Sequence, residues 1–319
     1  WDVEFQVSLD PGILNRAEWI SYVAAFFNLE SKASEIFSIM RADYNALKAL
    51  AQQLSEQEDR TPKVMWASFK AETCSNPDTD CDGVQGWIQV EGSWCHCGDI
   101  WAINNAHYKD NLVTDAGGEL VFAPAVLPAG CSETTNTDGY KTLSCTGADG
   151  LVSYKKFLAE ADAIIDETYI AGYDTTAHDF AGSFQVTADE VPALARNPPN
   201  IFRIDGRVSD ERDGWAVGSS WFDHSKAEPQ QLLAGMMEMI WVDSFESPCG
   251  LKYFRRAIPG QGQTQVSHDD CPYYDDSGNH DCAAIHEHLH EVPICTPPTA
   301  APTPAPMLAP TPAPTPAPT

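Results

Sequence analysis

The chain lacks several features that would assign a function directly. It contains no G-x-S-x-G, P-loop or G-x-G-x-x-G motif, so the common hydrolase, phosphate-binding and dinucleotide-binding signatures are missing. No run of 18 or more apolar residues occurs, so no segment of the sequence is expected to span a bilayer. Cations are few, with 19 lysines and arginines against 46 acidic residues. The net charge of −27 disfavours nucleic acid and anionic membranes as partners, because like charges repel.

Cysteines, by contrast, are plentiful. Ten of them lie in polar, turn-rich stretches, at positions 74, 81, 95, 97, 131, 145, 249, 271, 282 and 295. An even number in such stretches indicates disulfides and an oxidising compartment. Cys74 with Cys81 and Cys131 with Cys145 are plausible local pairs, although spacing alone does not fix the connectivity.

Two helices are predicted before residue 60. Apolar residues recur at three- and four-residue spacing from Ala33 to Leu54, which predicts an amphipathic helix over 31–57. At 1.5 Å per residue this helix is about 40 Å long, enough to reach across two lobes. A shorter helix over 15–27 precedes it, with Asn28 as the break. An ordinary helical hairpin fits the same periodicity.

Alternating strands and helices are predicted between residues 61 and 245. The apolar run 64–69 follows the breaker Thr61-Pro62 and is typical of a buried strand. Similar apolar runs lie near residues 120, 164 and 202, and helical stretches lie at 105–116, 150–160 and 228–241. The alternation predicts an α/β lobe of three layers with a mostly parallel sheet. Cysteine-bearing insertions at 72–98 and 128–148 decorate this lobe.

Several short stretches, taken in chain order, resemble those of one family. They are GluTrpIle at 18–20 with PhePheAsn at 26–28, TyrLysAspAsnLeuValThrAspAlaGlyGly at 108–118, AlaAspAlaIleIleAspGluThrTyr at 161–169, and a closing stretch of SerTrpPheAspHis at 220–224, AlaGluPro at 227–229 and LeuLeuAla at 232–234. Together they resemble the helical-backbone (class III) periplasmic substrate-binding proteins, which capture cobalamin or iron siderophores. The pattern is most similar to algal cobalamin-acquisition proteins.

The resemblance implies a non-enzymatic binding protein with two lobes joined by the 31–57 helix. Only residues 1–14 precede the helical segment, so most of the amino-terminal lobe is expected to be missing. The chain begins with Trp1 rather than Met and shows no signal peptide, which fits a fragment of a longer precursor. The family's closing motif also carries an aspartate and an arginine that face the ligand in cobalamin-binding relatives. Here their places hold Ser220 and His224 or Ser225, which leaves the ligand's identity open.

The ligand is expected beyond the carboxyl ends of the strands, where open α/β sheets bind their ligands. Aromatic side chains would cover a large flat ligand and a few polar groups would orient it. The candidate ligand-binding residues are Trp66, Phe69, Glu167, Thr168, Tyr169, Trp215, Ser220, Trp221 and His224. Asp166 and Glu167 are not expected to form an acid–base pair, because adjacent strand residues point to opposite faces. Cobalamin is the leading ligand, and a ferric siderophore or another metal chelate is the alternative; the aromatic candidates fit a core role equally well.

The chain divides into five parts on these grounds. They are the end of a truncated lobe (1–14), a helical segment (15–60), the α/β lobe (61–245), a Cys/His-rich extension (246–295) and a Pro/Thr-rich stalk (296–319). The stalk composition favours extended polyproline II and an extracellular setting. We therefore expect an extracellular or surface-tethered protein that captures a small nutrient and delivers it to a membrane transporter or receptor.

A competing motif lies in the extension. His286, Glu287 and His290 satisfy H-E-x-x-H, in which two histidines bind zinc beside a glutamate base. This pattern predicts a secreted zinc protease as the alternative function. Pro293 and the flanking cysteines disfavour the long helix that such a site needs, and a solvated polar segment or an adventitious metal site fits the same residues. Cys95-His96-Cys97 is too compact for a common zinc site, so a disulfide role is favoured there. A third alternative is a stalked surface protein that binds no small molecule.

Overall fold

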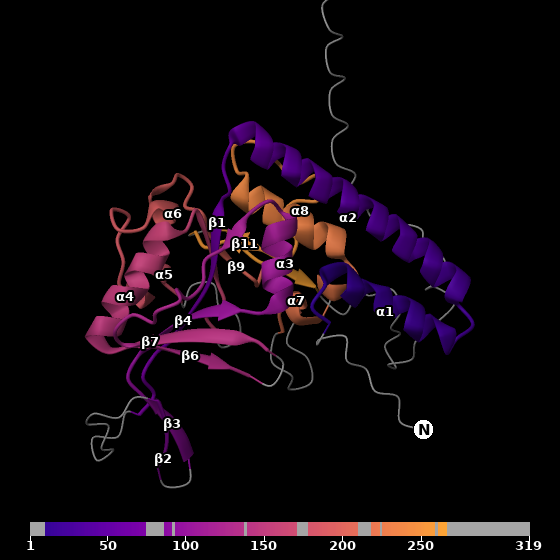
Figure 1. The fold of residues 1–319 in the computed structure, drawn as a ribbon. Helices are drawn as coiled ribbons and strands as arrows, with labels where there is room; N and C mark the ends of the chain where they lie inside the picture. Colours follow the sequence, from indigo (N-terminus) through magenta and orange to yellow (C-terminus); the bar gives the residue numbers. More distant parts are fainter. Residues whose placement is uncertain are drawn as a thin grey trace, which may run out of the picture.

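A computed structural model of the chain describes residues 10–74, 86–90, 93–136, 139–170, 178–209, 218–223, 225–258 and 261–266 (Figure 1). The helices in these parts are α1 (Ile13–Ala25), α2 (Glu30–Glu58), α3 (His107–Asp115), α4 (Gly147–Glu160), α5 (Phe180–Ser183), α6 (Pro192–Ala195), α7 (Ser220–Asp223), the 3-10 turn η3 (Ser225–Ala227) and α8 (Pro229–Ile240). The strands are β1 (Lys63–Lys70), β2 (Gly86–Val90), β3 (Ser93–Cys97), β4 (Ile100–Asn105), β5 (Glu119–Leu120), β6 (Cys131–Thr135), β7 (Lys141–Thr146), β8 (Ala163–Asp166), β9 (Ile201–Arg203), β10 (Arg207–Ser209), β11 (Arg255–Arg256) and β12 (Thr264–Val266).

Eight strands form one mixed sheet in the order β11-β9-β8-β1-β4-β7-β6, with β5 paired to β1. The strands β1, β5, β8 and β9 run parallel to one another, whereas β4, β6, β7 and β11 pair antiparallel to their neighbours. The predicted α/β lobe is therefore confirmed, and its parallel strands are those predicted near residues 64, 120, 164 and 202. The expectation of a mostly parallel sheet was wrong for the other half, because the cysteine-bearing stretch 93–146 contributes antiparallel strands as well as loops.

The parallel strands β1, β8 and β9 are buried on both faces, as expected for strands covered by helices on each side. Along β1, Val64 and Trp66 join one core with α2, α3 and α8, while Met65 and Ala67 join the other core with α4, α5 and α6. Figure 1 shows these two groups of helices on opposite sides of the sheet. The result is the three-layer arrangement that the alternation predicted.

The long helix α2 has two halves with different neighbours. Tyr44, Leu47 and Ala51 face the lobe and pack in the core beneath α8. Phe37 and Met40, nearer its start, pack instead against α1, so this half of α2 projects beyond the sheet together with α1 (Figure 1). Its 29 residues correspond to about 44 Å. The predicted long helix and the break at Asn28, whose φ is 55°, are both confirmed; that α2 bridges two lobes stays a prediction.

Disulfide bonds cross-link the cysteine-bearing insertions of the lobe. The predicted pair Cys131–Cys145 is confirmed and links the neighbouring strands β6 and β7. The pairing of Cys74 with Cys81 was wrong, because Cys74 bonds Cys95 on the hairpin strand β3. Cys97 is disulfide-bonded as well, which confirms the disulfide role of the Cys95-His96-Cys97 stretch. These bonds indicate maturation in an oxidising compartment.

Among the described residues, no helix has the length and apolar character needed to cross a membrane. The division of the chain into five parts stays a prediction. The stalk at 296–319 and the histidine-rich part of the extension lie outside the described residues.

Replacing Leu47 by alanine tests the packing of α2 on the lobe. Leu47 is fully buried, and deletion of a large buried aliphatic side chain costs about 2–5 kcal/mol of unfolding free energy. Urea denaturation followed by tryptophan fluorescence should show this loss. The matched control on the same helix is Ile39→Ala, at an exposed position, where a change within about 0.5 kcal/mol is expected. Equal effects of the two variants would contradict the packing.

Candidate functional site

The carboxyl ends of the parallel strands meet at one edge of the sheet. Asp166 ends β8, Arg203 ends β9, and the two residues are directly paired across the ladder. Ala67 of β1 pairs with Asp166 from the other side, and the backbone N–H of Glu167 donates to Ala67 O at 2.7 Å. This edge is where open α/β sheets bind ligands, so its side chains form the candidate site.

A buried ionic network holds this edge together. Arg203 Nη1 lies 3.1 Å from Asp166 Oδ2, and Arg203 Nε lies 3.1 Å from Asp205 Oδ2. The same Asp205 oxygen accepts from Arg255 Nη2 at 3.1 Å, which ties in the edge strand β11. His178 Nε2 contacts Asp166 Oδ2 at 2.5 Å. All four Asp and Arg side chains are buried, so each charge depends on its partners for compensation.

Asp166 is at the centre of this network, and its pKa reflects the interactions around it. Burial by itself would raise the pKa of Asp166, because desolvation disfavours the charged form. The hydrogen bond with His178 and the positive charge of Arg203 outweigh burial and hold the pKa of Asp166 below its usual value. The carboxylate is therefore ionised at neutral pH and serves as a structural anchor.

Thr168 belongs to the same structural network. Its hydroxyl oxygen accepts a hydrogen bond from the Phe69 N–H at 2.9 Å, and its carbonyl oxygen accepts from Arg203 Nη2 at 2.9 Å. Its own N–H donates to Asp166 Oδ1 at 2.9 Å. Thr168 is buried, so its hydrogen bonds join the ends of β1, β8 and β9.

An aromatic cluster lies on the α8 face of the same edge. The ring of Trp66 lies 5.3 Å from that of Trp221 and 6.3 Å from that of Phe254. Trp221 also lies 6.4 Å from Tyr108 of α3, whose ring is covered by the Arg16 guanidinium at 4.1 Å. Trp66 and Trp221 are both buried. Their rings form a closely packed aromatic plug below the surface.

A polar cluster adjoins this plug. Lys109 Nζ lies 2.5 Å from Glu167 Oε2 and 4.7 Å from the centroid of the Trp66 ring. Asn104 Nδ2 donates to the same Glu167 oxygen at 3.2 Å. Burial raises the pKa of Tyr108, and the negative charge of Glu167 adds to the rise. Glu167 thus lies close to the aromatic plug and has different partners from those of Asp166.

The predicted site residues therefore occupy three environments. Trp66, Trp221 and Thr168 are buried, whereas Phe69 packs on the opposite face against Trp101 and Phe184. Tyr169 is 75% exposed, and Phe222, next to Trp221 in the chain, is 51% exposed. Glu167 lies between these extremes. Ser220 begins α7, and Trp215 and His224 lie outside the described residues. The binding role of every predicted residue stays a prediction.

The sequence motifs also have structural roles. In the 108–118 stretch, α3 ends at Asp115, and Gly117 adopts a φ of +83°. A Cβ at Gly117 would lie 2.9 Å from the carbonyl oxygen of Ala51 on α2, so only glycine permits this close approach. Trp241 Nε1 donates to Ala116 O at 2.8 Å beside it. The stretch therefore joins α2, α3 and α8 and also places Lys109 at the site.

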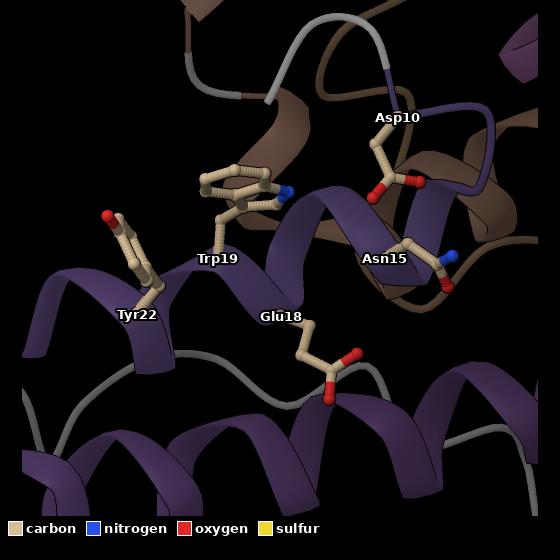
Figure 2. A pocket seen from close by; sticks show the side chains of 5 residues that line it. All are labelled: Asp10, Asn15, Glu18, Trp19 and Tyr22. Atoms are coloured by element: carbon tan, nitrogen blue, oxygen red, sulfur yellow. The ribbon is translucent and has the colours of Figure 1, made fainter. Parts of the chain in front are cut away.

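A separate surface hollow lies on α1, away from the strand ends. Asn15, Glu18, Trp19 and Tyr22 recur on one side of the helix and Asp10 closes the rim (Figure 2). Its volume is about 260 Å³, below the range typical of small-molecule sites. Figure 2 shows Trp19 and Tyr22 standing on the same side of α1. The hollow is too small to enclose a ligand of the size of cobalamin.

Sequence reasoning missed the residues that hold the edge together. His178, Arg203, Asp205, Arg255 and Lys109 come from different parts of the chain, and none was predicted as part of the site. One signal was available, because Arg203 and Asp205 directly follow the apolar run near 202, where charged residues at a strand end are expected to need partners. Those partners come from distant segments and carry no local sequence signal.

No group of three metal-binding side chains occurs in the described part of the chain. His286, Glu287 and His290 lie outside it, so the zinc alternative stays a prediction.

No protein-family model and no curated protein matches the chain. Two solved structures that it resembles are binding proteins. One is an ABC transporter solute binding protein from Sulfurospirillum deleyianum DSM 6946, with a TM-score of 0.40 and 12% identity, covering 75% of this chain and 55% of that one. The other is a periplasmic heme binding protein from Pseudomonas aeruginosa, with a TM-score of 0.35 and 9% identity, covering 72% of this chain and 60% of that one. The chain thus spans less than two thirds of either protein.

Replacing Asp166 by asparagine tests the ionic network. Loss of one partner from a buried charge network costs about 3–5 kcal/mol of unfolding free energy. Because the folded-state pKa of Asp166 lies below its usual value, its contribution is complete above about pH 5, declines as the pH falls through the unfolded-state value of about 4, and is lost below the folded-state pKa. Urea denaturation between pH 7 and pH 3 should show a difference between wild type and D166N that shrinks at the acid end.

The control for this series is Asp189→Asn, an exposed carboxylate whose loss should change the unfolding free energy by less than about 0.5 kcal/mol. A constant difference between wild type and D166N across the pH range would show that Asp166 does not act through its charge.

Proposed function

We propose that this chain is the ligand-capturing lobe of a non-enzymatic, extracellular substrate-binding protein, and that its ligand is cobalamin. The ligand lies across the carboxyl ends of β1, β8 and β9. Support comes from the sequence resemblance to helical-backbone binding proteins and from the arrangement of side chains at this edge. A ferric siderophore or another metal chelate is the alternative ligand.

The observation that carries the proposal is a pair of exposed aromatic side chains near the carboxyl edge of the sheet, one of which, Phe222, directly follows the buried Trp221. Tyr169 follows β8 and Phe222 lies on α7, and both are largely exposed. The segment before α7 is anchored to the end of β9, since Ser219 Oγ donates to Ile204 O at 2.6 Å. Large exposed aromatic side chains on rigidly anchored backbone are suited to cover a broad apolar ligand face.

The proposed extracellular location follows from the disulfide bonds, and the proposed second lobe follows from the length of α2. The disulfides place maturation in an oxidising compartment, which fits extracellular capture, and a membrane transporter or receptor would receive the cargo. The projecting half of α2 offers the attachment for a second lobe. A stiff helix in this place favours small lobe movements on binding.

Thermal unfolding with added ligand tests the proposed function. Specific binding to the folded state must raise the midpoint with ligand concentration, by about 2.7 kcal/mol of stability at 100 times Kd. We expect the 319-residue chain to respond to cyanocobalamin. A response to ferric siderophores alone would keep the binding role and replace the ligand. No response to either, with tightly bound zinc and hydrolysis that Glu287→Ala abolishes, would contradict the proposal.

Removal of the exposed aromatic rings tests the location. Phe222→Ala and Tyr169→Ala should each weaken cobalamin binding by about tenfold in isothermal calorimetry, because buried aromatic contacts dominate binding energies. The thermal midpoint of the free protein should change little, since exposed side chains contribute little to folding. Val152→Ala on α4, also exposed, is the control and should bind normally. Normal binding by both aromatic variants would place the ligand elsewhere.

A further inference from the structure

Glu167 presents its two carboxylate oxygens to different surroundings. Oε2 accepts hydrogen bonds from Lys109 Nζ at 2.5 Å and from Asn104 Nδ2 at 3.2 Å. Oε1 accepts no hydrogen bond from the described residues. It is also not among the fully buried oxygen atoms that lack a hydrogen-bond partner. The side chain of Glu167 is 12% exposed. Oε1 is therefore the carboxylate oxygen of this mostly buried side chain that remains available to a further donor.

The residues around Glu167 fix this orientation. Asn104 Nδ2 also lies 3.2 Å from Ser68 Oγ, and Thr142 Oγ1 donates to Asn104 Oδ1 at 3.3 Å. Lys109 is buried on α3 above the Trp66 ring. Hydrogen-bond donors from β4 and α3 thus converge on Oε2, while Ser68 and Thr142 hold Asn104 in place. Pre-organised side chains of this kind lose little conformational entropy when a ligand binds.

We propose that Glu167 is the specificity-determining residue of the binding site, and that its Oε1 accepts a hydrogen bond from an amide, hydroxyl or ammonium group of the ligand. Lys109 is the positioning residue: it neutralises Glu167 and fixes the carboxylate plane. The inference rests on the proposed function and names the ligand class within it. The site accepts a ligand whose peripheral groups are uncharged hydrogen-bond donors, and it rejects a ligand whose peripheral groups are carboxylates.

Electrostatics favours the same selection. The local carboxylate is compensated by Lys109, but the chain as a whole carries a net charge of −27, so an additional anionic group gains nothing from the surrounding field. A ligand carboxylate opposite Oε1 would place two acceptors against each other in a partly dehydrated site. Cobalamin carries amide groups around its ring, whereas porphyrins of the haem type carry carboxylates.

The test compares cyanocobalamin with its derivatives in which one peripheral amide is hydrolysed to a carboxylate. Calorimetric titration of the wild-type chain should show at least one of these acids binding about 10- to 100-fold more weakly than the amide, the range of a hydrogen bond to a charged group. In Glu167→Gln, the affinity for the amide ligand should fall by a similar factor. The ratio of the amide affinity to the acid affinity should fall below about threefold. The wild-type comparison requires no variant and stands if E167Q fails to fold.

Glu160→Gln is the matched control, since Glu160, at the end of α4, forms an exposed ion pair with Lys63 of β1; this variant should keep both affinities. A purely structural role of Glu167 would lower the thermal midpoint of E167Q and leave the ratio of amide to acid affinity unchanged. Tight cobalamin binding by wild type with no discrimination among the acids would overturn this inference and leave the proposed function standing. Binding of neither cobalamin nor its acids would overturn both.

Discussion

The buried charges at the carboxyl ends of the central strands are the constraint on which the rest of the lobe depends. Asp166 and Asp205 are fully buried, and two arginines from β9 and β11 lie between and beside them. A buried charge is tolerated only when it is paired and hydrogen-bonded, so β8, β9 and β11 are held in one register. Asp166 at the same time holds His178, which follows β8 in the chain. The ionic network therefore holds together the edge of the sheet that carries the candidate site.

The residues on the two sides of this edge differ in role: one group stabilises the fold, and the other forms the candidate site. Asp166 points into the network, while its neighbour Glu167 points to Lys109 and the aromatic plug. Trp66 and Trp221 pack in the same core as the residues of α8. Tyr169 and Phe222 are exposed. The lobe thus presents exposed aromatic side chains and one oriented carboxylate near this edge of the sheet.

Much of this architecture could be predicted from periodicity. The three- and four-residue spacing of Tyr44, Leu47 and Ala51 fixes the inner side of α2, and the apolar runs at β1, β8 and β9 identify the parallel strands. The antiparallel half of the sheet was missed, because β6 and β7 consist mostly of polar residues. The bond of Cys74 to Cys95 depends on the β2–β3 hairpin, which sequence spacing does not reveal. Several of the predicted site residues lie at one edge of the sheet, but the burial of Trp66 and the partners of Asp166 depend on segments distant in the chain.

A crystal structure of the 319-residue chain grown with cyanocobalamin tests the central claim most directly. The account predicts the corrin ring in van der Waals contact with Phe222 and Tyr169, and one of its amide nitrogens within about 3 Å of Glu167 Oε1. Cobalamin seated elsewhere, such as on the outer side of α1 or along α4, would contradict the account, as would crystals at saturating ligand that contain none.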